Sequence, residues 1–481
     1  MSREKKFALT FDDVSIVPGH SKVLPGEVDV STKLTKSIKL KIPIISAAMD
    51  TVTEERMAIV MAQNGGIGII HQYLTPEKQV EQVRRVKRYE SWIIENPMTI
   101  GPDETLETVK RMMRENEISG IPVVKNKKLV GIITKRDIRF VYNDNLKVKD
   151  LMTKDVVTVS KGITRDEAKR ILQKNKIEKL LVTGKDGSVK GLITTKDILK
   201  KEMYPDATRD SSGRLMVGAA VGVGDMERVD LLCKEGVDVI VVDSAHGHSQ
   251  KVLDTVKQIK KQFDIGVIGG NVVTAEGTED LISAGADAVK VGLGAGSICT
   301  TRVVTGVGVP QITAVESCAE VADRHNIPII SDGGIKQYGD IAKAIAAGAS
   351  SVMLGGLLAG TEEAPGRKTL LEGRLYKEYR GMGSEGALER RYGPGRYFRD
   401  TKGKTVPEGV EGIVDFVGSV AEVLHDMVGG LKHSMGYTGI KTLEEFRKKA
   451  VLIQVSVSSQ KEAHPSVRLI KEPRNYRSFT V

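Results

Sequence analysis

A glycine followed by a short apolar segment recurs along this chain, each time after a stretch with helical periodicity. Three copies read Lys234-Glu-Gly-Val-Asp-Val, Ser283-Ala-Gly-Ala-Asp-Ala and Ala346-Ala-Gly-Ala-Ser-Ser. A glycine in this place is typical of a helix C-cap, and a continuous apolar run is typical of a buried parallel strand. We predict eight such strands, at 43–48, 67–71, 215–221, 237–243, 265–270, 287–292, 327–332 and 350–355. The pattern favours an α/β fold with a (β/α)8 TIM barrel over its competitor, an open doubly wound sheet.

Residues 91–205 lie between the second and third predicted strands and contain an internal duplication. Ile118-Ser-Gly-Ile-Pro-Val-Val aligns with Ile177-Glu-Lys-Leu-Leu-Val-Thr, and Gly131-Ile-Ile-Thr-Lys-Arg-Asp aligns with Gly191-Leu-Ile-Thr-Thr-Lys-Asp. We therefore predict a barrel in two parts, 1–90 and 206–481, and two inserted domains at about 91–149 and 150–205.

The two repeats resemble paired CBS domains, the tandem or Bateman arrangement. In that family the threonine and aspartate of this motif contact an adenine or guanine nucleotide. The resemblance implies a regulatory nucleotide site at Thr134, Asp137, Thr194 and Asp197. An aspartate that only caps the following helix is the alternative.

Charge and composition narrow the classes of partner. The net charge of +10 favours anionic ligands, but aromatic residues are only 4% of the chain, which is poor material for stacking nucleic-acid bases. Three scattered cysteines do not form a disulfide framework. Met1-Ser-Arg-Glu-Lys-Lys lacks the apolar core of a signal peptide, and no apolar run is long enough for a membrane span. We expect a cytoplasmic protein that acts on phosphorylated small molecules.

Cys299 lies in the glycine-rich loop Gly294-Ala-Gly-Ser-Ile-Cys-Thr-Thr-Arg, directly after the sixth predicted strand. A thiol among free backbone amides at the carboxyl end of a barrel strand is typical of a nucleophile, although a packed thiol in a tight turn is the alternative. Four other strands end in polar or glycine turns: Asp243-Ser-Ala-His, Gly269-Gly-Asn, Ser331-Asp-Gly-Gly and Gly355-Gly. The turns after strands seven and eight are where such barrels commonly bind phosphate.

Further motifs extend the pattern: Leu9-Thr-Phe-Asp-Asp, Tyr379-Arg-Gly-Met-Gly-Ser, Arg396-Tyr-Phe and Pro407-Glu-Gly-Val-Glu-Gly. Together with the cysteine loop and the CBS pair, they resemble the inosine-5′-monophosphate (IMP) dehydrogenase family over essentially the whole chain. The resemblance implies oxidation of IMP to xanthosine 5′-monophosphate with NAD, the committed step of GMP synthesis. It also implies a monovalent cation, usually K+, and a homo-oligomer, a tetramer by family analogy.

The resemblance assigns catalytic roles to four residues. The Cys299 thiolate attacks C2 of the purine, and Arg396 and Tyr397, on a flap at about 385–411, activate the water that hydrolyses the adduct. Thr301 lies near the same water, although its hydroxyl could instead only satisfy the loop backbone. An arginine ordinarily stays protonated, so ordinary pKa reasoning would make Arg396 an anion binder.

The binding residues are carried over motif by motif. Contacts to the substrate are implied for Ser46, Met49, Ser297, Asp332, Gly334, Gly355, Gly356, Tyr379, Met382, Gly383 and Glu408. Contacts to NAD are implied for Asp243, Ser244 and Asn271, since Gly292-Leu-Gly-Ala-Gly lacks the spacing of a Rossmann fingerprint. Carbonyl groups of Gly294, Gly296 and Cys299 would hold the cation, together with Glu462, Ala463 and His464 of a neighbouring subunit. Gly356 and Ala463 depart from the family pattern, which often has serine at both places.

Two rival functions remain. GMP reductase shares the barrel, the cysteine loop and the phosphate turns, and the expected difference is the Arg396-Tyr397 flap and the CBS insertion. A catalytically inactive nucleotide sensor, in which the CBS pair does the work, is the other. Cys299, Thr301, Arg396 and Tyr397 together argue against the sensor.

Overall fold

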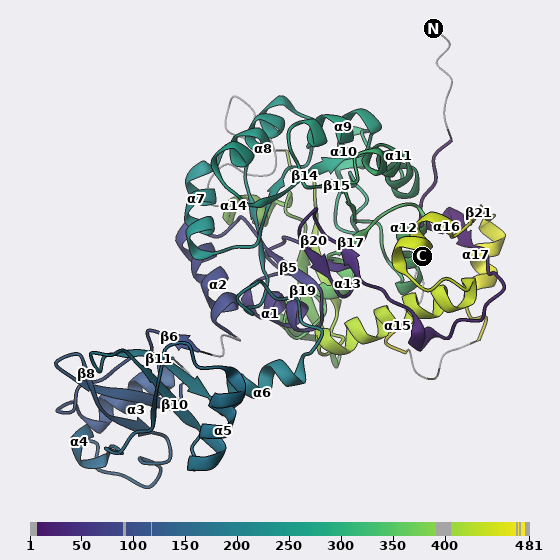
Figure 1. Ribbon diagram of the computed structural model, residues 1–481. Helices are drawn as coiled ribbons and strands as arrows, with labels where there is room; N and C mark the ends of the chain where they lie inside the picture. The colour runs from purple at the N-terminus through teal and green to yellow at the C-terminus, as the bar shows by residue number, and fades with distance from the viewer. Residues whose placement is uncertain are drawn as a thin grey trace. The chain divides into compact units, whose positions relative to one another are not determined.

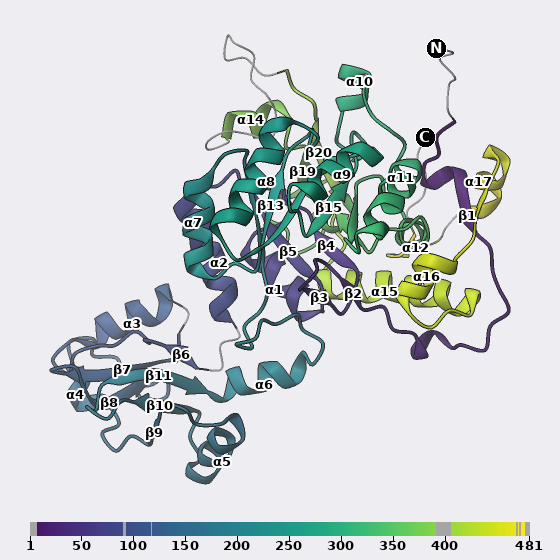
Figure 2. The same ribbon diagram turned by 45° about the horizontal axis from the view of Figure 1, so that its top comes forward.

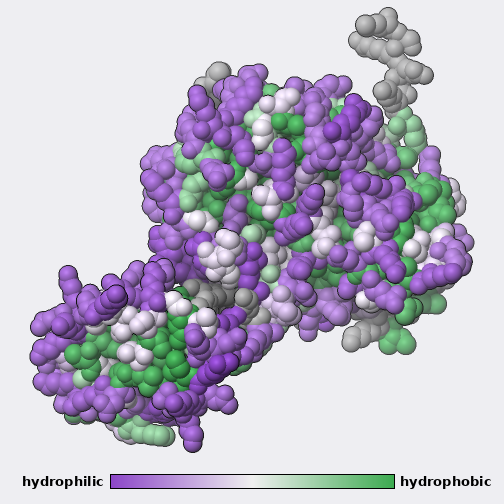
Figure 3. Space-filling view, in the orientation of Figure 1, coloured by the Kyte–Doolittle hydropathy of each residue, from purple (hydrophilic) through white to green (hydrophobic). Residues whose placement is uncertain are grey.

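The computed structural model describes residues 7–89, 93–116, 118–390, 406–467, 470 and 473–476. The chain forms two compact units: a barrel unit, Met1–Tyr89 with Asp206–Val481, and an inserted unit, Glu90–Pro205. Charged and polar residues cover most of the face seen in Figure 3, with smaller apolar areas between them. Among the described residues, no helix has both the length and the apolar character needed to span a bilayer.

Eight parallel strands close into a barrel in the barrel unit, in the order β12-β13-β14-β15-β16-β17-β4-β5 (Figures 1 and 2). The closed order confirms the predicted TIM barrel and excludes the open sheet. Each strand overlaps one of the predicted ranges. Their bounds are Ile44–Ser46 (β4), Ile67–Ile70 (β5), Gly218–Val221 (β12), Val239–Asp243 (β13), Gly266–Val272 (β14), Ala288–Val291 (β15), Ile329–Asp332 (β16) and Ser351–Leu354 (β17).

Helices between these strands surround the barrel (Figure 1). Gly236 caps α7 in the left-handed conformation, and Gly285 and Gly348, which follow α9 and α12, also have positive φ, so the repeated glycine turns each helix into its strand. The main helices are α1 (Glu55–Gln63), α2 (Pro76–Tyr89), α7 (Met226–Glu235), α8 (Gln250–Gln262), α9 (Ala275–Ser283), α11 (Gln311–Arg324), α12 (Tyr338–Ala346) and α15 (Val420–Thr438).

The barrel interior is a single apolar cluster that includes Ile45, Ile67, Val241, Ile268 and Ile330. Leu34 and Leu40 join it from the hairpin of β2 (Thr32–Lys33) and β3 (Lys39–Leu40). Thr35 of the same hairpin packs beside Gly266, at the amino end of β14. The hairpin therefore occupies the amino end of the barrel and leaves the carboxyl ends of the strands for a binding site.

Three smaller groups of elements complete the barrel unit. The antiparallel sheet β18-β19-β20 consists of Lys368–Leu371, Arg374–Arg380 and Glu411–Asp415. Near the chain ends, β1 (Val14–Ile16) pairs with β21 (Leu452–Gln454), so these two strands lie side by side. The short helices are α10 (Thr301–Thr305), α13 (Gly356–Ala359), α14 (Glu385–Arg390), α16 (Leu443–Lys449) and α17 (Val457–Ala463).

The inserted unit contains two copies of a helix followed by a β-hairpin, in agreement with the duplication. The first copy is α3 (Leu106–Glu115), β7 (Gly120–Lys125) and β8 (Lys128–Thr134), and the second is α5 (Arg165–Asn175), β10 (Lys179–Thr183) and β11 (Val189–Thr194). Ile132 of the first copy packs with Leu181 and Leu192 of the second. The remaining elements are β6 (Ile94–Glu95), α4 (Val148–Leu151), β9 (Thr158–Ser160) and α6 (Thr195–Met203).

Candidate active site

A cavity opens at the carboxyl ends of the barrel strands. It encloses about 900 Å³, including the part open to solvent. The sequence placed most of its candidate residues at these strand ends, and the fold brings them together here. The predicted site residues that line the cavity are Met49, Asp243, Asn271, Gly294, Gly296, Ser297, Cys299, Asp332, Gly334, Gly355, Gly356, Tyr379, Met382 and Glu408.

Cys299, Thr301 and Glu408 form a chain of polar contacts at one side of the cavity. The Cys299 sulfur lies 3.2 Å from Thr301 Oγ1, and the Thr301 hydroxyl donates to Glu408 Oε2 at 2.8 Å. Because a hydroxyl has one hydrogen and Thr301 gives it to Glu408, the thiol donates to Thr301. A proton can therefore pass from the thiol to the carboxylate through Thr301.

Backbone hydrogen bonds hold the segment that carries Cys299 against the segment that carries Glu408. Cys299 and Gly409 form an antiparallel bridge, and the Thr300 amide donates to the Glu408 carbonyl at 3.1 Å. The Val410 amide donates to the Ile298 carbonyl at 3.0 Å. The distance between thiol and carboxylate is therefore set by main-chain geometry rather than by flexible side chains alone.

Neutral donors gather at another part of the cavity. A Cβ on Gly355 would lie 2.7 Å from the Tyr379 hydroxyl oxygen, so only glycine fits there without a shift. Burial raises the pKa of Tyr379 far above its ordinary value, against an opposing hydrogen bond from Ser297, so the phenol stays neutral and can donate. Neutral hydroxyls and amides around glycine turns suit a phosphate group.

Lys290, which the sequence did not lead us to predict, lines the cavity and binds three polar side chains that also line it. Its ammonium donates to Asp332 Oδ2 at 2.7 Å, to Asp243 Oδ1 at 3.1 Å and to Asn271 Oδ1. Asn271 Nδ2 in turn donates to Asp332 Oδ2 at 2.9 Å and to the Gly292 carbonyl at 2.8 Å. The lysine side chain is only 2% exposed, and among the described residues that line the cavity it is the one cation.

Strand alternation was the signal that could have found Lys290. Ala288, Val241 and Ile330 all belong to the barrel interior. Side chains two residues further along a strand point the same way, which places Lys290, Asp243 and Asp332 at the mouth of the barrel.

Four predicted site residues near the cavity, three of them contact residues and one catalytic, do not line it. The buried Ser46 hydroxyl accepts from Thr53 Oγ1 at 2.8 Å, and the Ser244 hydroxyl accepts from the His246 amide at 3.3 Å. Thr301 lies behind Cys299, and the Gly383 carbonyl accepts from the Glu408 amide at 2.9 Å. These residues support the wall of the cavity through the contacts named.

The remaining candidates lie elsewhere. Glu462 and Ala463 end α17 and His464 follows it, with His464 Nδ1 3.1 Å from the Tyr476 hydroxyl. In the inserted unit, Asp137 Oδ2 accepts from both the amide and the hydroxyl of Thr134, each at 2.7 Å. Thr194 ends β11. Arg396, Tyr397 and the side chain of Asp197 lie outside the described residues.

A closed (β/α)8 barrel with a thiol, a hydroxyl and a carboxylate in contact at its carboxyl end is the arrangement of a barrel enzyme. The family model of the IMP dehydrogenase / GMP reductase domain matches residues 8–466. The chain belongs to this family.

Relatives of known name cover nearly the whole chain. Inosine-5′-monophosphate dehydrogenase of Aquifex aeolicus is 54% identical over 99% of both chains, and that of Bacillus subtilis is 53% identical over 99% of both. Among solved structures, GMP reductase C318A from Trypanosoma brucei in complex with guanosine 5′-monophosphate has a TM-score of 0.92 at 40% identity. It covers 97% of this chain and 99% of its own.

That coverage corrects one expectation from the sequence. The inserted unit is about a quarter of the chain, so a match over 97% of it includes residues of the inserted unit. A GMP reductase therefore shares the insertion, and the insertion does not distinguish the two activities.

Proposed function

We propose that this chain is an NAD-dependent IMP dehydrogenase that oxidises IMP to xanthosine 5′-monophosphate. The Cys299–Thr301–Glu408 arrangement supports this most directly, in a chain whose curated relatives at 50–54% identity are named inosine-5′-monophosphate dehydrogenase. The barrel unit, 1–90 with 206–481, would carry the catalysis. The inserted unit, 91–205, would be a CBS pair.

In the first half of the reaction, Cys299 Sγ bonds to C2 of the purine. The thiol proton leaves through Thr301 toward Glu408, a path that the two short contacts support. Bound NAD+ supplies the acceptor for the hydride that departs from C2. In the second half, water adds to C2, the carbon–sulfur bond breaks, and the thiol is restored. IMP, NAD+ and water are thus converted to xanthosine 5′-monophosphate, NADH and a proton.

The cavity residues are suited to three parts of the ligands. Neutral donors at Ser297, Gly334, Gly355, Gly356 and Tyr379 would bind the phosphate, and Asp332 would bind the ribose hydroxyls. Because Cys299 must reach the ring, the base would lie beside Glu408 and Met382, with Met49, Gly383 and Ser46 around them. Asp243 and Asn271, with Ser244 behind them, would contact NAD.

The resemblance also carries proposals about the cation, assembly and regulation. Carbonyl oxygens of Gly294, Gly296 and Cys299 are the hard ligands that K+ prefers, and the φ of +70° at Gly294 gives the loop its tight turn. Glu462, Ala463 and His464 of a neighbouring subunit would complete the site in a cytoplasmic homotetramer. An adenine or guanine nucleotide would bind the CBS pair near Thr134, Asp137, Thr194 and Asp197, although the Thr134–Asp137 contacts also fit a purely structural role.

A spectrophotometric assay tests the proposed activity. We expect IMP and NAD+ to yield NADH, with activity that depends on K+. Consumption of NADPH with GMP, and no NADH from IMP, would assign the reductase activity instead. Nucleotide binding to the inserted unit without turnover of either substrate would favour the sensor.

Replacing Arg396 with alanine should separate the two halves of the reaction. If Arg396 activates water, hydride transfer proceeds at near its usual rate while hydrolysis slows by about 10²- to 10⁴-fold. The covalent adduct on Cys299 then accumulates. Rapid-quench measurement of NADH and mass spectrometry of the trapped protein check both halves. An Arg396→Ala variant that forms NADH in steady state with no detectable adduct would contradict the assignment.

A further inference from the structure

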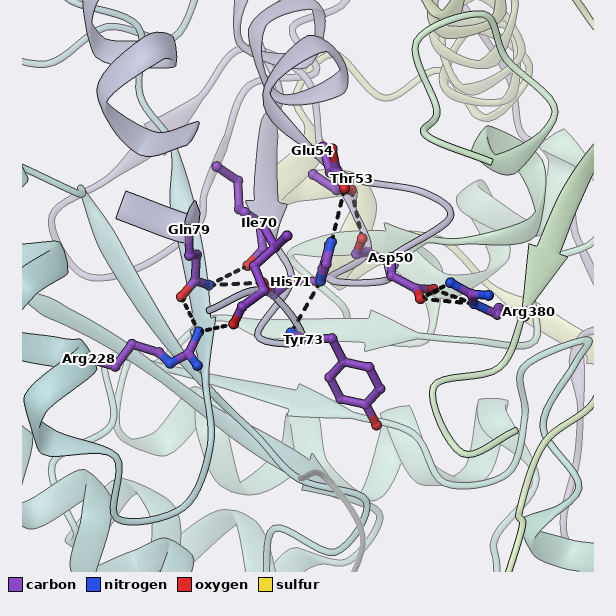
Figure 4. A network of polar contacts seen from close by, with 11 residues as sticks. Asp50, Thr53, Glu54, Ile70, His71, Tyr73, Gln79, Arg228 and Arg380 are labelled. Carbon is purple, nitrogen blue, oxygen red and sulfur yellow. Dashed lines mark hydrogen bonds and ion pairs between the residues drawn. The ribbon is translucent and has the colours of Figure 1, made fainter. Parts of the chain in front are cut away.

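The loop that follows β5 is fixed by three buried side chains (Figure 4). Gln79 Nε2 donates to the carbonyls of Ile70 and His71, each at 3.1 Å. Arg228 Nη1 donates to Gln79 Oε1 at 2.9 Å and to the Leu74 carbonyl at 3.0 Å. The ring of His71 lies with Nε2 3.4 Å from Glu54 Oε1, while Nδ1 accepts from the Tyr73 amide at 3.2 Å. Residues 70–74 are thus held rigidly at the mouth of the barrel.

Tyr73 extends from this rigid loop to the wall of the active-site cavity. Its hydroxyl donates to the Met382 carbonyl at 2.5 Å, and the residue is 6% exposed. The ring packs in a small apolar cluster with Met382 and Ala387, against which Met49 also packs. Met49 and Met382 both line the cavity, so Tyr73 stands directly behind its wall.

The segment that carries Met382 has a second anchor. Arg380 Nε donates to both carboxylate oxygens of Asp50, at 2.9 and 3.2 Å, and the Arg380 amide donates to Thr51 Oγ1 at 3.3 Å. Asp50 follows β4, the barrel strand next to β5. Residues 380–382 are therefore held by the loops of two adjacent strands: Asp50 binds Arg380 (Figure 4), and Tyr73 binds the Met382 carbonyl.

Met382 lies next to a residue that contacts the Cys299–Thr301–Glu408 group. The next residue, Gly383, accepts a hydrogen bond from the Glu408 amide, and the Glu408 carboxylate accepts from Thr301 beside the nucleophile. Since the base must lie where Cys299 can reach it, a shift of the Met382 carbonyl moves the surface against which the base packs. Four of the five phosphate donors come from other loops, and the fifth, Tyr379, lies on β19 ahead of the residue that Tyr73 holds.

We propose that Tyr73 is a positioning residue for the purine base, which acts by holding the Met382 carbonyl in place. The proposal rests on the function proposed above. Tyr73→Phe keeps the ring and its packing but leaves a buried carbonyl without its donor, and such a group moves to find another partner or water. We expect recognition of the base to weaken while recognition of the ribose phosphate is retained.

Calorimetry without NAD tests this on the full chain, with IMP and ribose 5-phosphate as probes. For Tyr73→Phe we expect the Kd of IMP to rise by about fivefold or more, and that of ribose 5-phosphate to stay within about twofold. In turnover, the KM for IMP should rise more than kcat falls. The matched control is Tyr437→Phe, which removes a hydroxyl from a residue that is 67% exposed on α15.

Equal weakening of both probes in the Tyr73 variant would mean a merely structural role and would overturn the proposal. An unchanged Kd for IMP would overturn it as well, and leave the proposed function intact. Wild-type protein that binds ribose 5-phosphate no more weakly than IMP, and does not oxidise IMP, would overturn the function itself.

Discussion

Cys299→Ala should reduce the oxidation of IMP by about 10⁴-fold or more, with IMP binding retained. No other thiol can replace it. Burial raises the pKa of both Cys233 and Cys318 to about 11, and neither lines the cavity. The measurements are NADH formation at saturating substrates and the Kd of IMP. Cys233→Ala, which removes a thiol from α7, should keep the wild-type rate. A Cys299→Ala variant with more than about 1% of that rate would contradict the covalent mechanism.

Alkylation gives an independent measure of the same prediction. A thiol with a pKa of about 11 is protonated at pH 8, where only about one in a thousand such groups is a thiolate. Iodoacetamide at pH 8 should therefore modify Cys299 before the other two cysteines, and IMP should protect it. Peptide mapping identifies the modified residue. Faster labelling of Cys233 would show that Cys299 is not the reactive thiol.

The barrel was predictable because its signals are local. A glycine with positive φ after a helix, then a buried apolar strand, is a pattern within about ten residues, and it recurs at Gly236, Gly285 and Gly348. The same locality made Cys299, Asp243 and Asp332 visible as candidates, since each stands at or just past a strand end.

Lys290 and Tyr73 were not predicted from the sequence, for different physical reasons. Lys290 lies inside a strand whose other residues are apolar, and its importance depends on three partners from three other strands of the barrel. Tyr73 depends on a contact with Met382, a residue 309 positions away. Such contacts arise from the topology of the fold, so no local sequence pattern predicts them. The insertion was misleading in the opposite way, because the match to a reductase over 97% of this chain includes residues of the inserted unit.

Lys290→Met should lower both the stability of the barrel unit and its activity. The substitution leaves the carboxylates of Asp243 and Asp332 at the cavity without their shared cation. Breaking a buried pair by removing one partner costs about 3–5 kcal/mol, which urea denaturation would measure as a lower free energy of unfolding. Because Asp332 and Asp243 would then no longer be held in position, we also expect kcat/KM to fall by about tenfold or more.

Lys87→Met is the matched control for this variant. Lys87 is 3% exposed and binds Asp238 Oδ2 at 2.7 Å and Asp210 Oδ2 at 2.9 Å, so it too is a buried lysine between two aspartates. It lies on α2 and does not line the cavity. Burial raises the pKa of Asp238 even against the opposing charge of Lys87. We expect Lys87→Met to lose comparable stability while the kinetic constants of the folded protein stay unchanged.

A double variant separates charge from packing at Lys290. If unpaired carboxylates cause the loss of stability, then Asp243→Asn in the Lys290→Met background removes one buried charge and should restore about 1 kcal/mol or more. The same substitution in the wild-type background should destabilise, because it removes one of the lysine's partners at 3.1 Å. The two effects of Asp243→Asn would thus have opposite signs. Equal destabilisation in both backgrounds would mean that Lys290 does not act by neutralising Asp243, and that other contacts hold this carboxylate in place.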